Sequence, residues 1–176
     1  MAHSLAESLA NIYRVCSKAL YPVLNGLSEQ QLNWKPAPES RSISEIYRHL
    51  IRVDAWFLKQ FQIQPAVQDP GETHAAHLLD SLRQSHQYVL DLLRACQTPA
   101  DLRRQSPAPE LAGHNTLAEA IIHMAQHYLY HLAQVIYLRR AQDRAWPPPQ
   151  AEWEHATYVL SDHLLMIQQI KAVDPT

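Results

Sequence analysis

Glycine and cysteine are both scarce in this sequence, with 3 and 2 residues among 176. Proteins built from β-hairpins use glycine in their tight turns, so its scarcity, together with abundant leucine and alanine, favours helices. The two cysteines, Cys16 and Cys96, lie far apart in apolar, helix-like segments and form no CxxC pair. We therefore expect buried free thiols and not a disulfide.

Long apolar runs and clusters of one charge are missing as well. No stretch of about 18 apolar residues occurs, so we expect no membrane-spanning helix. The first seven residues contain no basic segment followed by an apolar run, which argues against a secretion signal and for a cytoplasmic location. The net charge is −2 with neutral histidines, and basic residues do not cluster beyond two arginine pairs. We therefore expect no nucleic-acid partner and no membrane partner.

Helix starts can be predicted from a repeated four-residue pattern. In a capping box, a serine or threonine side chain accepts a hydrogen bond from a free backbone N–H, and a glutamate three residues later reaches back to another. The pattern occurs at Ser4–Glu7, Ser42–Glu45 and Thr116–Glu119, each time before an apolar-periodic run.

The apolar periodicity predicts five long helices and no strands. Pro22 is expected to kink or end the first helix, residues 28–34 to form a short helical turn, and residues 98–113 to form a long irregular connection. The predicted helices span residues 5–24, 43–61, 73–96, 117–141 and 151–170. We predict an all-α fold in one domain, residues 1–176. Its core is an antiparallel-type four-helix bundle over about residues 5–141, with an additional C-terminal helix outside it.

Histidine is the residue type that stands out, with 11 in the chain. His123, His127 and His131 are spaced four residues apart, which places neighbours above one another on a helix face, about 5–6 Å apart at Cβ. Two imidazoles at this spacing can bind one metal ion, as in the HExxH motif. Either His127 with His131 or His123 with His127 can supply the pair. A third ligand must come from another helix, and His49 is the best candidate because it shares the inward face of its helix with apolar residues.

Several other side chains receive structural interpretations. We expect Gln134 to orient a ligand, Trp34 and Trp56 to pack in the core, and one of the tyrosines between His127 and His131 to do the same. Three further histidines of the third predicted helix are expected mostly to face solvent, namely His74, His77 and His86.

Three segments resemble the DinB-like proteins. Residues 25–38, from Asn25-Gly26-Leu27 to Pro36-Ala37-Pro38, are similar to the family's first signature, and residues 42–50 are similar to the helix that carries its first metal-binding histidine. Residues 127–134 resemble its H-x-x-x-H…Q motif, although many members have His-Arg-Gly-Gln where this chain has His131-Leu-Ala-Gln134. The resemblance covers about residues 5–140. It implies a four-helix bundle that holds zinc, nickel or another divalent ion through His49, His127 and His131, and it leaves His123 out of the site.

The resemblance implies two kinds of enzyme, and a non-enzymatic role is an alternative to both. Some relatives are thiol S-transferases that use low-molecular-weight thiols such as bacillithiol or mycothiol, and others are described as metal-dependent hydrolases. We favour the transferase, with a small-molecule substrate, because no carboxylate lies between His127 and His131 to act as a base toward water. Glu110 of the long connection could supply such a base. The alternative is a metal-stabilised interaction or stress-response module. We also expect a homodimer, and we assign no catalytic residue beyond the metal ligands.

Overall fold

The computed structural model describes residues 4–65, 67, 74–107 and 115–172, with side chains described up to residue 162. Its regular elements, apart from one isolated bridge between Gln105 and Thr116, are all helical within these residues. The all-α prediction is confirmed. The elements in chain order are α1 (Leu5–Lys18), η1 (Tyr21–Leu24), α2 (Glu29–Asn33), α3 (Ile43–Gln60), α4 (Ala75–Ala95), α5 (Pro99–Leu102), α6 (Leu117–Gln142) and α7 (Gln150–Ala172).

The predicted capping boxes at the starts of α1, α3 and α6 all form. Two more occur that the Ser/Thr-x-x-Glu pattern does not detect, because the third residue of the helix is Gln31 in α2 and Asp101 in α5. Each of these side chains accepts the backbone N–H of the cap residue, as a glutamate does.

Two predicted boundaries are wrong. α1 ends at Lys18 instead of continuing to residue 24, and the chain resumes as the 3₁₀ helix η1 with Pro22 in its first turn. Proline lacks the N–H that an α-helix interior needs, and it is tolerated in a first turn. The 98–113 connection is not irregular throughout, because α5 forms at its start. Residues 108–114, Glu110 among them, lie outside the described residues.

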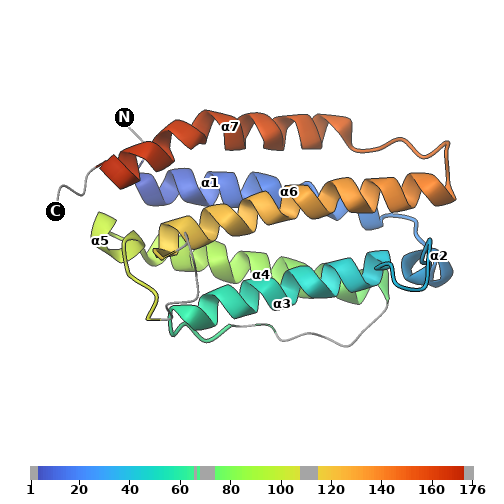
Figure 1. The fold of residues 1–176 in the computed structure, drawn as a ribbon, viewed down its shortest axis with the longest axis horizontal. Coiled ribbons are helices and arrows are strands. Elements are labelled where there is room, and N and C mark those ends of the chain that lie inside the picture. The colour runs from blue at the N-terminus through green and yellow to red at the C-terminus, as the bar shows by residue number, and fades with distance from the viewer. Residues whose placement is uncertain (1–3, 66, 68–73, 108–114, 173–176) are drawn as a thin grey trace.

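Four helices form the bundle, in the ring order α1, α4, α3, α6 (Figure 1). α1 and α6 run in one direction and α3 and α4 in the other. The neighbours α1–α4 and α3–α6 are therefore antiparallel, while α3–α4 and α1–α6 are parallel. The predicted antiparallel arrangement thus holds for two of the four neighbour pairs. α3 and α4 can run in parallel because residues 61–74 separate them in the chain.

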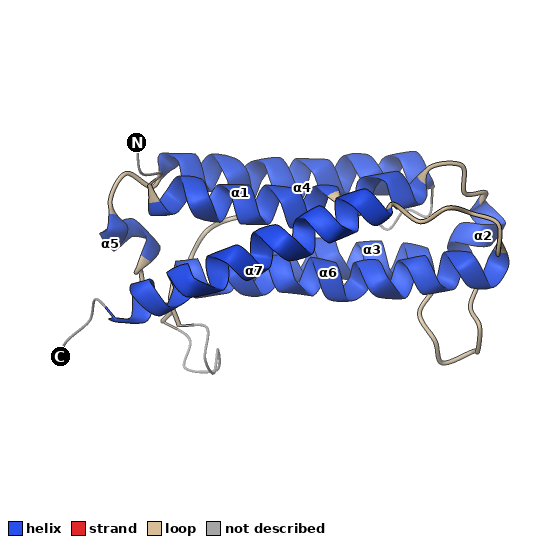
Figure 2. Cartoon of the chain, turned by 90° about the horizontal axis from the view of Figure 1, so that it is seen from above, coloured by secondary structure: helices blue, strands red, loops and turns tan. Residues whose placement is uncertain are grey.

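α7 is the additional C-terminal helix, and it lies over the groove between α1 and α6 (Figure 2). Its Ala156 is fully buried, and the Cys16 thiol of α1 donates to the Ala156 carbonyl at 3.9 Å. Cys16 and Cys96 are both free thiols, as predicted, but only Cys16 is buried and Cys96 is partly exposed. No helix within the described residues is long and apolar enough to cross a membrane.

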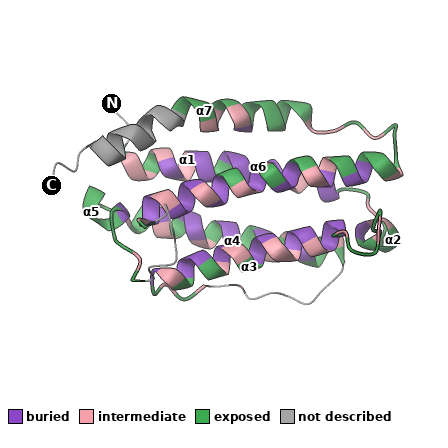
Figure 3. Ribbon diagram, viewed as in Figure 1, coloured by how far each residue is buried: buried purple, intermediate pink, exposed green. Residues whose placement is uncertain are grey.

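The buried faces of the four bundle helices point toward one another (Figure 3). At their centre lies a polar cluster around the fully buried carboxylate of Asp54. Its Oδ2 accepts hydrogen bonds from the Tyr13 hydroxyl at 3.1 Å, from the Ser85 hydroxyl at 3.0 Å and from the Tyr128 hydroxyl. This cluster fixes how α1, α3, α4 and α6 rotate about their axes, because a buried carboxylate without these donors would be costly.

Two expectations about burial are wrong. His86 is buried and does not face solvent. Its ring stacks on Tyr21, and its Nδ1 is hydrogen-bonded to the Tyr21 hydroxyl at 2.8 Å. Trp56 is 47% exposed and is not a core residue, whereas Trp34 packs partly buried against the core. His74 and His77 are exposed, as expected.

Candidate metal centre

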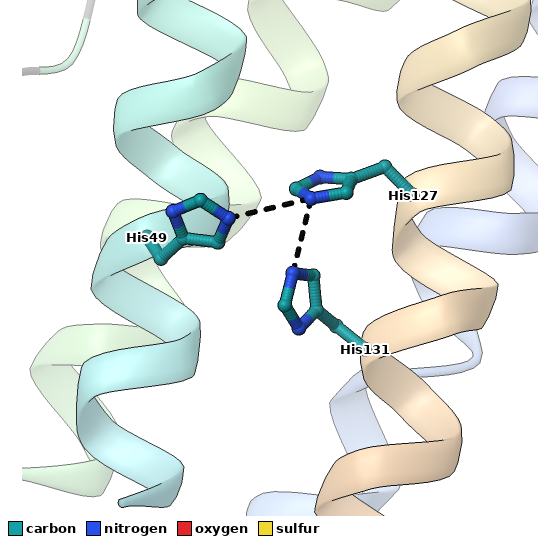
Figure 4. A group of neighbouring side chains, drawn as sticks. All are labelled: His49, His127 and His131. Atoms are coloured by element: carbon teal, nitrogen blue, oxygen red, sulfur yellow. Dashed lines mark hydrogen bonds between the residues drawn. The ribbon is translucent and has the colours of Figure 1, made fainter. Parts of the chain in front are cut away.

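Two neighbouring helices carry the three histidines of the site. His49 lies on α3, one turn from the buried Ile46, and His127 and His131 lie one turn apart on α6. Because α3 and α6 pack side by side, the imidazole of His49 points across the interface to the other two (Figure 4). The structure therefore brings together the three side chains that the sequence singled out.

The distances between the rings suit one ion. His127 Nε2 lies 3.0 Å from His131 Nε2 and 3.3 Å from His49 Nε2, and one ligand nitrogen from each residue lies within 4.8 Å of the others. Nitrogens about 2.0–2.1 Å from a tetrahedral zinc ion would be roughly 3.3 Å apart. The three imidazoles are thus placed closely enough to bind a metal ion.

Gln134 sets the orientation of one of these rings. Its Oε1 lies 2.7 Å from His131 Nδ1, one turn along α6. An amide oxygen can only accept, so Nδ1 carries the hydrogen and the lone pair of Nε2 is left facing His127. Such outer hydrogen bonds fix the tautomer and the ring orientation of metal-binding histidines. The sequence-based expectation that Gln134 orients a ligand agrees with this contact.

Burial keeps the three imidazoles neutral at pH 7. Burial, together with the smaller effect of the positive charges of neighbouring groups, lowers the pKa of His49 to about 4 and that of His127 to about 3. The pKa of His131 is also lowered by burial, against the opposing effect of its bond to Gln134. Neutral imidazole is the form that binds a metal, so the site does not need to release protons from these rings first.

The histidines border a cavity of about 780 Å³. Apolar and aromatic side chains form most of its wall, and Arg41, Ser40 and Gln134 add polar groups. Its lining within the described residues contains no aspartate or glutamate. The described residues of the lining are Pro36, Ser40, Arg41, Ile46, His49, His127, Tyr130, His131, Ala133, Gln134, Tyr137 and Leu138.

His123 and Asp54 lie outside the three-histidine group. His123 is not in the three-histidine group, and its ring packs against Phe57 at 5.1 Å and is stacked on His127 at 6.1 Å between ring centroids. Asp54 is buried in the polar cluster at the bundle centre, because five positions along a helix turn a side chain well away from His49. Tyr128 is the fully buried tyrosine of the His127–His131 segment, and Tyr130 is the exposed one.

The sequence interpretation missed Arg41 and Tyr137. Tyr137 follows Tyr130 by two turns on α6 and Gln134 by one, so helical spacing from the ligands could have identified it. Arg41 precedes the N-cap of the helix that carries His49, but nothing in the local pattern says which way its side chain turns.

Comparison with known proteins supports one assignment. Comparison with curated proteins gives no match. A model of the DinB superfamily matches residues 13–135, which is more than half of the chain and includes all three histidines. With its helical bundle and three-histidine group, the chain belongs to the DinB superfamily.

Proposed function

We propose that this protein is a divalent-metal-dependent enzyme that transfers a low-molecular-weight thiol to an electrophilic small molecule. The observation that carries the proposal is a cavity with three converging, neutral histidines and no carboxylate in its described lining. Zinc or nickel is the proposed ion, because imidazole nitrogen suits both. A cytoplasmic location belongs to the proposal, since small thiols are kept reduced there.

The residues present fit the role of a catalytic metal site. Three imidazoles leave at least one position of a four-coordinate ion open, whereas structural sites are closed by four protein ligands. A bound divalent ion would lower the pKa of a coordinated thiol enough to hold it as thiolate at neutral pH. His49, His127 and His131 would hold the ion, and Gln134 would keep His131 in the productive tautomer.

The remaining cavity residues bind and orient, and none of them needs to act as a base. In the proposed reaction the thiol sulfur forms a bond to the electrophilic carbon, the leaving group departs with its bonding electron pair, and the thiol proton passes to solvent. A free thiol has a pKa near 8.5, so little help is needed to remove this proton. Activation of water is more demanding, and metal hydrolases commonly pair the ion with a carboxylate base.

The test is an assay of full-length, metal-loaded protein with several small thiols and a chromogenic electrophile, beside ester and amide substrates. We expect product formation that requires both metal and thiol and that is lost in His127→Ala. His123→Ala is the matched control, because it removes an imidazole from the same helix and leaves the three ligands in place.

Two results would contradict the proposal. Metal-dependent hydrolysis without thiol dependence, abolished by Glu110→Gln, would show that the protein is a hydrolase. If metal raises the stability of the protein but neither the thiol reactions nor the ester and amide substrates show turnover, the non-enzymatic alternative is supported.

A further inference from the structure

Arg41 borders the same cavity as the three histidines, from the side of α3. It immediately precedes Ser42, the N-cap of α3, whose N–H donates to Glu45 Oε2 at 2.9 Å. This capping box fixes the backbone at the point where the arginine side chain leaves it. The guanidinium group is therefore attached to an ordered helix start two turns from His49 along the sequence.

The guanidinium of Arg41 has no hydrogen bond and no ion pair with any residue in the described part of the chain. Glu45, which follows Arg41 by four residues, is already held by Lys35 at 2.6 Å. A smaller cavity adjoins the first at Ser40 and Arg41. Its charged lining does not neutralise Arg41, since four basic residues outnumber two acidic ones: Lys35, Arg41, Arg48 and Arg52 against Glu39 and Glu45.

Arg41 and the three histidines line one cavity. The described residues of that lining include no carboxylate, so none of them would attract an ammonium group or pair with the guanidinium.

Aromatic and aliphatic side chains of the same cavity suit the carbon skeleton of a small ligand. Tyr130 and Tyr137 are two turns apart on α6 and border the cavity, with 61% and 70% of their surfaces exposed. Pro36 and Leu138 extend the same apolar lining. A ligand that reaches the histidines would thus enter a cavity bordered by aromatic rings and by a guanidinium.

We propose that Arg41 binds an acidic group of the ligand, so that the site takes thiols that carry a carboxylate in preference to neutral or cationic ones. The planar guanidinium presents two parallel N–H groups that match the two oxygens of a carboxylate. The inference rests on the proposed function for the thiol, while the role of Arg41 toward an acidic ligand follows from the cavity itself.

The experiment measures ligand binding directly and not turnover. Full-length protein loaded with Co²⁺ is titrated with 3-mercaptopropionate, its neutral analogue 3-mercaptopropionamide, and the cationic cysteamine. Thiolate binding to Co²⁺ gives a charge-transfer absorption band that reports occupancy. We expect the acidic thiol to bind about tenfold more tightly than the amide, the size of effect that one charge-assisted hydrogen-bond pair provides, and cysteamine to bind most weakly.

Three variants assign the preference to Arg41. In Arg41→Gln the acid and the amide should bind within about twofold of each other, and in Arg41→Lys an intermediate preference should remain because the charge is kept without the planar fork. Arg103→Gln is the matched control, since Arg103 is exposed, ends α5 and does not line the cavity. Cobalt stoichiometry and circular dichroism should be unchanged in all three.

A second ligand pair separates this inference from the proposed function. N-hydroxysuccinamic acid and butyrohydroxamic acid bind metals through oxygen and differ in one carboxylate, and their binding is followed by the visible cobalt spectrum. If no thiol binds but the acidic hydroxamate keeps an Arg41-dependent preference, the thiol function fails and the role of Arg41 stands. If thiols bind without preference for the acid, or if Arg41→Gln keeps the preference, the inference is overturned and the thiol function stands. Failure of Co²⁺ to bind would overturn both.

Discussion

His127 has an imidazole neighbour one turn away on each side along α6, and the two neighbours have different surroundings. His131 is 97% buried, is oriented by Gln134 and meets His127 through Nε2. His123 packs against Phe57 of α3 instead. Helical spacing treats the two neighbours as equivalent, and only their contacts distinguish them.

Single substitutions of these histidines should therefore differ in metal content. Loss of an outer hydrogen-bond partner of a metal ligand lowers metal affinity by about 10–100-fold. Replacing His49, His127 or His131 with alanine should lower metal affinity by more than this. His123→Ala should retain the metal. The measurement is metal stoichiometry by elemental analysis of protein purified without a histidine tag. Equal loss in all four variants would show that His123 also takes part in binding.

Asp54 should make stability depend on pH. Burial raises the pKa of its carboxyl from 3.8 to about 7, against the lowering effect of its hydrogen bonds from Tyr128, Ser85 and Tyr13. A carboxyl whose pKa is higher in the folded state contributes stability that is present below pH 4 and lost as the pH rises to about 7. Relative to Asp54→Asn, the wild-type free energy of unfolding should therefore fall by about 4 kcal/mol between pH 4 and pH 8.

Urea unfolding of both metal-free proteins across this pH range provides the test. The histidines of the metal centre, whose pKa values are lowered, change stability in the opposite direction, but they are present in both proteins and cancel in the difference. Parallel curves for the two proteins would contradict the assignment to Asp54.

At the scale of the elements, one arginine ties the end of α6 to the segment after α1. Arg139 is buried, and its guanidinium donates to the carbonyl oxygens of Val23 and Asn25, the latter at 2.6 Å. The ring of Trp146 lies 4.2 Å from the guanidinium carbon on the other side. The next residue after Asn25 is Gly26, whose φ of 73° falls in the left-handed region that glycine adopts without strain.

Removing this arginine should destabilise the fold without touching the metal ligands. Arg139→Ala would leave two carbonyl groups without their charged donor, so we expect the free energy of unfolding to fall by about 3 kcal/mol. Arg140→Ala, an exposed neighbour, should change it by no more than about 0.5 kcal/mol. Denaturant unfolding measures both, and similar midpoints for the two variants would argue against a structural role for Arg139.

At the scale of the whole molecule, the histidine site joins two helices that are distant in sequence. His49 lies on α3 and the other two on α6, so an ion held by all three would bind the folded chain and not the unfolded one. A metal concentration of 100 times the dissociation constant should stabilise the protein by about 2.7 kcal/mol, which corresponds to a rise in Tm of about 5–10 °C. Calorimetry with zinc and with a chelator tests this. A similar rise in His127→Ala would place the stabilising ion elsewhere.

Assembly is also decided at this scale, and a homodimer stays our prediction. α7 exposes Trp153 and Tyr158, with 40% and 69% of their surfaces accessible in the single chain. Aromatic residues of this kind are enriched in interfaces between proteins. Light scattering at micromolar concentration should give twice the 20.2 kDa mass of the chain. A single species of 20.2 kDa, the mass of one chain, would contradict the prediction.

The sequence alone determined the features that depend on a few neighbouring residues. The capping boxes fixed where α1, α3 and α6 begin, because each is closed within four residues. The spacing of the histidines placed possible ligands on one helix face, and the apolar inward face of its helix singled out His49. The resemblance to the DinB family then favoured His131 over His123. Pro22 marked the end of the first helix only approximately, because proline is tolerated within the first turn of a new helix.

Only the tertiary structure decided how the helices turn toward one another. It placed His131 and not His123 opposite His49, enclosed His86 and Asp54 in the bundle, and put Arg41 on the wall of the cavity. Each outcome depends on the rotation of α1, α3, α4 and α6 about their axes and on the parallel course of α3 and α4. The rotation must pack all four apolar faces at once and also give the buried carboxylate of Asp54 its three hydrogen-bond donors. These donors come from different helices, so no single segment of the sequence determines the rotation.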